Sequence, residues 1–88
     1  MGLKNSKHKK WTKLHLAAWE GDIKLVKVLI ENGADVNAVT KFKDTTLHYA
    51  IKNGHADIAK VLLQNGADVN RVNKENRTAV DYAVEYGH

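Results

Sequence analysis

The sequence contains no cysteine and no proline among its 88 residues, and aromatic side chains make up only 7% of it. The absence of cysteine excludes a disulfide framework and any metal site that needs thiolate ligands. No run of about 18 apolar residues occurs, so no segment has the length of a membrane-spanning helix. No apolar segment follows the basic residues near the start, so we expect no secretory signal. The remaining composition is that of one small globular domain.

The net charge of +4 is concentrated at the start of the chain. The first ten residues contain four lysines and no acidic residue: Lys4, Lys7, Lys9 and Lys10. The rest of the chain is formally neutral, with ten basic and ten acidic side chains. Residues 1–10 are polar and lack helical periodicity, so we expect a flexible basic arm there and a folded domain over residues 11–88.

A repeat with a period of 33 residues dominates the sequence. The segment TTLHYAIKNGHADIAKVLLQNGADVN at 45–70 repeats TKLHLAAWEGDIKLVKVLIENGADVN at 12–37, and a third copy, TAVDYAVEYGH, occupies 78–88. A fixed period of this size is typical of stacked architectures, in which each unit buries its apolar face against the next. We place the units at about 7–39, 40–72 and 73–88, the last of them partial.

Each full unit predicts two short helices followed by a hairpin-like connection. A threonine is the expected N-cap of the first helix, at Thr12, Thr45 and Thr78, and a glycine ends that helix. The second helix shows apolar residues at a spacing of three to four, and an Asn-Gly pair ends it. Its apolar residues are Leu25, Val26, Leu29 and Ile30 in the first unit and Ile58, Val61, Leu62 and Leu63 in the second. The third unit predicts only a first helix.

These motifs resemble the ankyrin repeat, whose pattern combines T-x-L-H and a glycine around the first helix with G-A-D-V-N after the second. The matching segments include 14–18 (LHLAA), 33–37 (GADVN), 47–48 (LH) and 66–70 (GADVN). The resemblance covers about residues 7–88. It implies an all-α ankyrin-repeat solenoid of stacked helix-turn-helix units joined by short hairpin-like loops, and a non-catalytic role in protein–protein interaction.

The chain departs from the family pattern at the start of each first helix and at each hairpin tip. The family's proline after the threonine is replaced by Lys13, Thr46 and Ala79. Because proline at the first helical position fixes φ, we expect its absence to loosen these helices slightly. The family's tip glycine falls at Lys10, Lys43 and Asn76. Lysine adopts positive φ less readily than asparagine, so we expect the first two tips to be less regular or more mobile.

The third unit also departs from the pattern. Asp81 replaces the histidine of the LH motif, and no second helix follows. The apolar side of the preceding helix, around Ile58 and Leu62, would then lack a neighbour, whereas solenoid ends normally carry polar caps. We therefore expect either fraying after Asn70 or self-association through this end.

No motif in the sequence predicts catalysis. His15 and His48 occupy one repeat position, and the resemblance implies that they bond to neighbouring backbone. The GADVN acids, Asp35 and Asp68, recur with a turn whose backbone such side chains satisfy. A nucleophile elbow, a phosphate loop and a metalloprotease motif are all absent from the sequence. We expect no enzyme activity, no cofactor and no metal site.

In the resembling family, partners are recognised by the hairpin tips and the ends of the first helices. Carried over position by position, the tips supply Trp11, Lys41, Phe42, Asp44 and Arg77, with His8, Lys9, Lys74 and Glu75 beside them. The helix ends supply Trp19, Glu20, Lys52, Asn53, Glu85 and Tyr86. Tryptophan, tyrosine and arginine dominate interface hot spots. The alternative is that Trp11 and Phe42 fold back onto the first helices and that Trp19 only covers a neighbour.

The arm supports a separate hypothesis. Its first six residues, MGLKNS, match the N-myristoylation pattern with Gly2 as the acceptor, and the lysines would add electrostatic attraction to an anionic membrane. The alternative is a basic tail that only keeps the chain soluble. We do not expect nucleic-acid binding, because the neutral repeats provide no basic face.

The leading interpretation is a protein-binding module, acting as a scaffold or adaptor for another protein or peptide in the cytoplasm. Two alternatives remain open. One is a membrane-associated adaptor held by the basic arm, and the other is a repeat fragment that self-associates through its incomplete last unit.

Overall fold

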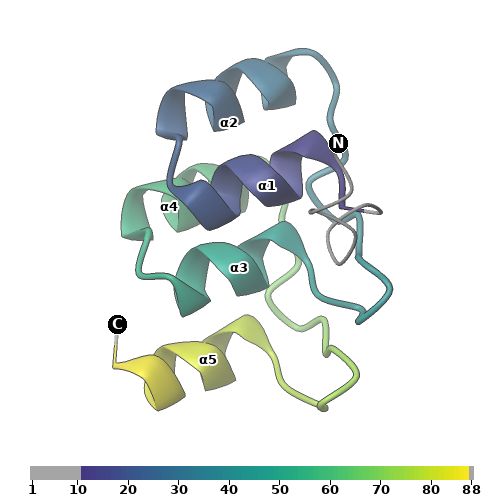
Figure 1. Ribbon diagram of the computed structural model, residues 1–88, viewed down its shortest axis with the longest axis vertical. Coiled ribbons are helices and arrows are strands. Elements are labelled where there is room, and N and C mark those ends of the chain that lie inside the picture. Colours follow the sequence, from purple (N-terminus) through teal and green to yellow (C-terminus); the bar gives the residue numbers. More distant parts are fainter. Residues whose placement is uncertain (1–10, 88) are drawn as a thin grey trace, which may run out of the picture.

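The computed structural model describes residues 11–87. Within this range the chain forms five α-helices: α1 (Lys13–Glu20), α2 (Ile23–Glu31), α3 (Thr46–Lys52), α4 (Ala56–Gln64) and α5 (Ala79–Tyr86). Helices α1, α3 and α5 lie side by side in one row, and α2 and α4 form a second row (Figure 1). The two long connections, 32–45 and 65–78, extend from the same end of the helices (Figure 1). The predicted all-α repeat solenoid is confirmed.

The three helices of the first row begin with the same local structure. In each, the hydroxyl of the N-cap threonine accepts a bond from the third helical N–H, and that third residue's side chain accepts one from the threonine N–H. The third residue is His15 in α1, His48 in α3 and Asp81 in α5. Two backbone donors that a helix start leaves unpaired are thereby satisfied. These helices start at the predicted threonines without the family's proline.

Position 21, between α1 and α2, requires glycine for two reasons. Its φ of 83° lies in the left-handed region that closes a helix. A Cβ at this position would also lie 2.6 Å from Cε1 of the His55 ring, because the second unit packs directly onto this turn. Asp22 then caps α2 by accepting a bond from the Leu25 N–H at 3.1 Å.

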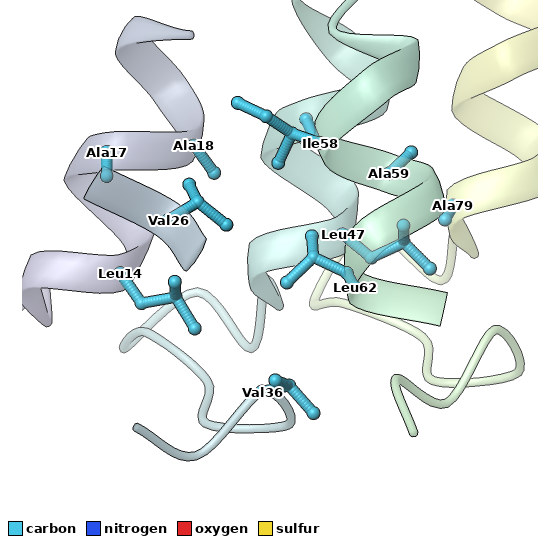
Figure 2. Packing of buried hydrophobic residues seen from close by; sticks show 11 residues of the cluster. Leu14, Ala17, Ala18, Val26, Val36, Leu47, Ile58, Ala59, Leu62 and Ala79 are labelled. Atoms are coloured by element: carbon cyan, nitrogen blue, oxygen red, sulfur yellow. The ribbon is translucent and has the colours of Figure 1, made fainter. Parts of the chain in front are cut away.

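The hydrophobic core lies between the two rows of helices. Figure 2 shows its side chains converging from both rows, with Val26 of α2 and Ile58 of α4 among them. Ile58 and Leu62 are completely buried. The expectation that these two residues lack a neighbour is therefore wrong, because they belong to the side of α4 that completes the core.

The segment after Asn70 folds into a turn and a helix, whereas fraying was one of the two expectations from the sequence. It ends in α5, which has the same capping structure as α1 and α3. Tyr82 is only 3% exposed and its hydroxyl accepts a hydrogen bond from Asn73 at 2.8 Å. Helix α5 is therefore held on α3 by these polar contacts, by the buried Tyr82 ring and by Ala79, which belongs to the hydrophobic core.

The two described hairpin tips have the same turn geometry. Lys43 and Asn76 both adopt a φ of 63°, at the predicted tip positions. The Lys43 N–H donates to the carbonyl of Thr40 at 2.8 Å, and the Asn76 N–H donates to that of Asn73 at 2.9 Å. The expectation that the Lys43 tip is less regular is wrong, since the same hydrogen bond closes both turns.

The G-A-D-V-N turns also have the structural role expected of them. The Asp35 carboxylate accepts a bond from the Asn37 N–H, and Asp68 does the same for Asn70. The Asn37 side chain bridges the two turns, donating to the carbonyl of Gly66 and accepting from the Asp68 N–H.

None of the five helices described for residues 11–87 has the length and apolar character of a membrane-spanning helix.

Candidate functional site

The two repeat histidines connect successive units. Nε2 of His15 lies 3.0 Å from the carbonyl oxygen of Ala38, and Nε2 of His48 lies 2.8 Å from that of Arg77. In both rings Nδ1 accepts a bond from the N-cap threonine N–H, so the proton is on Nε2 and is donated to the carbonyl. Burial lowers the pKa of His15, which favours this neutral form. The predicted bonds from these histidines to neighbouring backbone are confirmed.

A buried polar network joins the bases of the two tips. One carboxylate oxygen of Asp44 accepts from the Tyr49 hydroxyl at 3.1 Å, and the other accepts from the Asn73 side-chain amide at 2.7 Å. Asp44 is only 9% exposed. The expectation that Asp44 faces a partner from the tip is therefore wrong, because its carboxylate is used to hold the second and third units together.

Asn73 is the centre of this network. Its amide nitrogen also donates to the Tyr82 hydroxyl at 2.8 Å, and its oxygen accepts from the backbone N–H groups of Glu75 and Arg77. Burial, assisted by the nearby carboxylates of Asp44 and Glu75, raises the pKa of Tyr82 to about 12, so the phenol stays neutral. Burial also raises the pKa of Tyr49.

Sequence reasoning missed the three residues that organise this site: Tyr49, Asn73 and Tyr82. A signal for two of them was available, because Tyr49 and Tyr82 stand 33 residues apart at one repeat position. Asn73 had no such signal, since the equivalent position holds Thr40. The two tips are also joined directly, by a bond from the Lys74 N–H to the Phe42 carbonyl at 3.0 Å.

Aromatic rings extend from this network across all three units. The Trp11 ring stacks on Tyr49 with centroids 4.3 Å apart, and the Trp19 ring meets Tyr49 edge-on at 5.6 Å. Both tryptophans are half-buried. They therefore support the packing of α1 on α3, in agreement with the structural alternative, although neither residue is fully buried.

Lys52 lies where these rings come together. Its ammonium group is 6.0 Å from the centroid of Trp19, 5.8 Å from that of Tyr82 and 5.7 Å from that of Tyr86. Such distances allow cation–π attraction to three rings from α1 and α5 at once. We call the surface formed by Trp11, Trp19, Phe42, Lys52 and Tyr86, above the buried ring of Tyr82, the aromatic face.

The aromatic face contains a cleft of about 130 Å³. Phe42, Lys52 and Tyr82 line it together with the charged Lys74 and Glu75. The cleft has the size and polarity to hold one side chain of a bound segment.

Within residues 11–87 there is no group of three or more His, Cys, Asp or Glu side chains arranged to hold a metal ion.

The remaining predicted contact residues occupy varied positions. Lys41 is exposed and holds its ammonium group 5.3 Å from the Phe42 ring centroid. Arg77 forms an ion pair with Glu85. Asn53 donates to the carbonyl of Trp19 at 2.9 Å, so it ties α3 to the end of α1. Glu20 and Tyr86 are exposed.

Several predictions concern residues outside the described range. They are the arm, the acylation of Gly2, and the tip residues His8, Lys9 and Lys10.

The repeated caps, the histidine bridges and the stacked turns agree with a comparison to known families. Residues 14–88 match the family model described as ankyrin repeats, in three copies. The chain belongs to the ankyrin repeat family. Ankyrin repeats generally mediate protein–protein interactions and are typically non-catalytic.

The chain is also similar to a protein of Arabidopsis thaliana named phytochrome-interacting ankyrin-repeat protein 1. The two are 62% identical over 29 residues, which is 33% of this chain and 17% of that relative. The match therefore spans only a small part of the relative.

Proposed function

We propose that the aromatic face binds a partner protein or peptide, with Phe42 and Tyr86 as its main apolar contacts. The observation that carries this proposal is the exposure of these two rings. Phe42 is 46% exposed and Tyr86 is 40% exposed, whereas the neighbouring aromatic residues Tyr49 and Tyr82 are buried. Exposed aromatic rings beside a preformed cleft are a common feature of interface hot spots.

The charges around the cleft support a mixed apolar and acidic partner segment. Lys74 is exposed in the cleft lining, Lys41 is exposed next to the Phe42 ring, and Lys52 is half-buried among the rings. The cleft lining also contains two acidic residues, the exposed Glu75 and the buried, hydrogen-bonded Asp44. An apolar side chain in the cleft, with an acidic residue facing the lysines, would match this arrangement.

A test uses capture from a lysate with the full chain as bait. The variant Phe42→Ala/Tyr86→Ala removes the two exposed rings, whereas Trp11 and Trp19 are left unchanged because they also support packing. The matched control is Val28→Ala/Val69→Ala, whose side chains are 48% and 36% exposed on α2 and in the turn after α4. We expect proteins captured by the wild type to be lost with the aromatic variant and kept with the control.

Thermal melts of both variants check that each still folds. Partners retained equally by the aromatic variant and the wild type would contradict the proposal. The relative's name records phytochrome as a partner of that protein, so a phytochrome is one purified protein to test. The assignment of the aromatic face does not depend on that result.

The membrane-associated adaptor and the intracellular, cytoplasmic location remain predictions. The first rests on residues 1–10, which lie outside the described range.

A further inference from the structure

A second surface lies at the far end of the second row of helices, beyond α4. It is an apolar groove of about 470 Å³. Its apolar lining includes Ile51, Ala59, Leu63 and Ala83, and Lys60 is the only lining residue with a permanent charge. The groove is separate from the aromatic face, because the two share no lining residue.

The repeat explains why this groove is apolar. Subtracting 33 from Leu63 and Ala83 gives Ile30 and Ala50. Leu63 is 44% exposed whereas Ile30 is half-buried, and Ala83 is half-buried whereas Ala50 is completely buried. Both residues thus gain exposure in the later unit. The earlier unit has α4 packed beside α2, so the groove continues the α2–α4 interface beyond α4.

The packing of α4 on α2 shows which side chains a helix in this row presents to its neighbour. Leu25 and Val28 of α2 are 40% and 48% exposed. Their counterparts in α4, Ile58 and Val61, are completely buried and half-buried. Helix α4 therefore meets α2 with branched aliphatic side chains at Ile58, Val61 and the adjacent Leu62, which is the i, i+3, i+4 pattern of an amphipathic helix.

A second copy of this chain does not fit the groove in the repeat geometry. Seating its α2 beyond α4 would place its α1, which precedes α2 in the same unit, at the position that α5 occupies. A single helix has no such conflict. Because Lys60 is not balanced by an acidic lining residue, an acidic residue on the flank of that helix would be favoured.

We propose that the groove binds one amphipathic helix of a partner protein, in the orientation that α4 has on α2. The bound helix has branched aliphatic residues at i, i+3 and i+4. This is a helix-in-groove mode of recognition, and it is independent of the aromatic face.

The probe is a labelled synthetic peptide with the sequence of residues 55–66, HADIAKVLLQNG. A short isolated helix is marginal in water. The helix of the peptide is therefore stabilised by a covalent bridge. The peptide carries Gln64→Glu, and the new side-chain carboxylate forms an amide bond with the side-chain amine of Lys60, four residues earlier. In the chain these two positions line the groove, so in the bound peptide they face away from α4. Binding to the full 88-residue chain is followed by fluorescence anisotropy.

We expect saturable binding that Leu63→Lys weakens about tenfold or more. Leu25→Lys is the matched control, because Leu25 has nearly the same exposure at the opposite end of the row, and it should leave the affinity unchanged. Phe42→Ala/Tyr86→Ala should also leave it unchanged, so failure here and failure of the aromatic-face proposal can be told apart.

Three outcomes would overturn the inference. The first is no saturable binding, or equal binding of a peptide with the same residues in scrambled order. The second is an equal loss of affinity in Leu25→Lys. The third is dimerisation of the wild type, seen by sedimentation and removed by Leu63→Lys, which would show that a second copy covers the groove instead.

Discussion

The second and third units place different side chains at one repeat position, His48 and Asp81. Both side chains accept a bond from the N-cap threonine, at 3.0 Å for His48 and 2.9 Å for Asp81. His48 also donates to the carbonyl of Arg77 in the following tip. Asp81 has no following tip within residues 11–87 to bridge. The comparison shows that the histidine has two roles, a local cap and a link to the next unit, and that an acid can replace it where only the cap is needed.

The two tips differ in a similar way. Thr40 and Asn73 stand at equivalent positions, but the Thr40 hydroxyl contacts Tyr49 and the Phe42 N–H, whereas Asn73 makes four side-chain bonds. The third unit has no second helix in the described range to pack behind it. Its attachment therefore depends more on polar contacts than that of the second unit.

Replacement of His48 should give the largest effect. His48→Ala removes the cap and the bond to Arg77 and leaves a cavity at a fully buried position, so we expect a loss of about 3 kcal/mol in the free energy of unfolding. Asp81→Ala removes only an exposed cap and should cost about 1 kcal/mol or less. Urea unfolding followed by circular dichroism measures both. Equal losses would show that the bond between units contributes little.

Asn73→Ala should be next in size. It removes the amide that bonds the Asp44 carboxylate and the Tyr82 hydroxyl, and we expect a loss of about 2 kcal/mol. Thr40→Ala removes fewer bonds and should cost about 1 kcal/mol. The same unfolding measurement applies, and hydrogen exchange of the α5 amides should rise more in Asn73→Ala. If Thr40→Ala were the more destabilising change, the third unit would not depend on this network.

Thr46 offers a gain in stability. Its hydroxyl is completely buried and has no hydrogen-bond partner within the described residues, whereas the equivalent residue of the third unit is Ala79. Thr46→Val should stabilise the protein by about 1 kcal/mol. Thr46→Pro also removes the hydroxyl, and it should stabilise the protein by about 0.5 kcal/mol more than Thr46→Val does. The reason for this extra gain is that Thr45 already has the extended ψ of 169° that is favoured before proline.

The control for Thr46→Pro is Ala79→Pro. Ala79 has no hydroxyl to remove, so this substitution should give only the stabilisation that comes from proline. Thermal melting of all three variants separates the two causes. A lower melting temperature for Thr46→Val would mean that the hydroxyl is satisfied in solution.

The smallest effect concerns the hairpin tips. Lys43→Gly relieves the cost of positive φ but increases the entropy of the unfolded chain, so we expect a net gain of about 0.5 kcal/mol. Asparagine tolerates this conformation, so Asn76→Gly should change the stability by about zero. Differential scanning calorimetry on the two variants tests the difference, and a larger gain from Asn76→Gly would reverse the comparison.

Most of the fold could be predicted from the repeat. The threonine caps, the helix-ending glycines and the turn asparagines are local features, and each recurs at a spacing of 33 residues. The candidate site was predicted less well. Asp44 was expected at the surface and is buried, and Trp19 proved to contribute to packing as well as to the surface. These outcomes depend on which neighbour lies across the next unit, and position within a repeat does not determine that.

The amino-acid sequence by itself determined the stack, because hydrogen-bonding caps and periodic apolar residues specify each unit locally. Only the tertiary structure decided which surfaces stay open. Ile58 and Leu63 both lie on α4 and are similarly apolar, yet one is completely buried and the other is 44% exposed. The physical reason is that burial depends on the neighbouring helix, which is present on one side of α4 and absent on the other within the described residues.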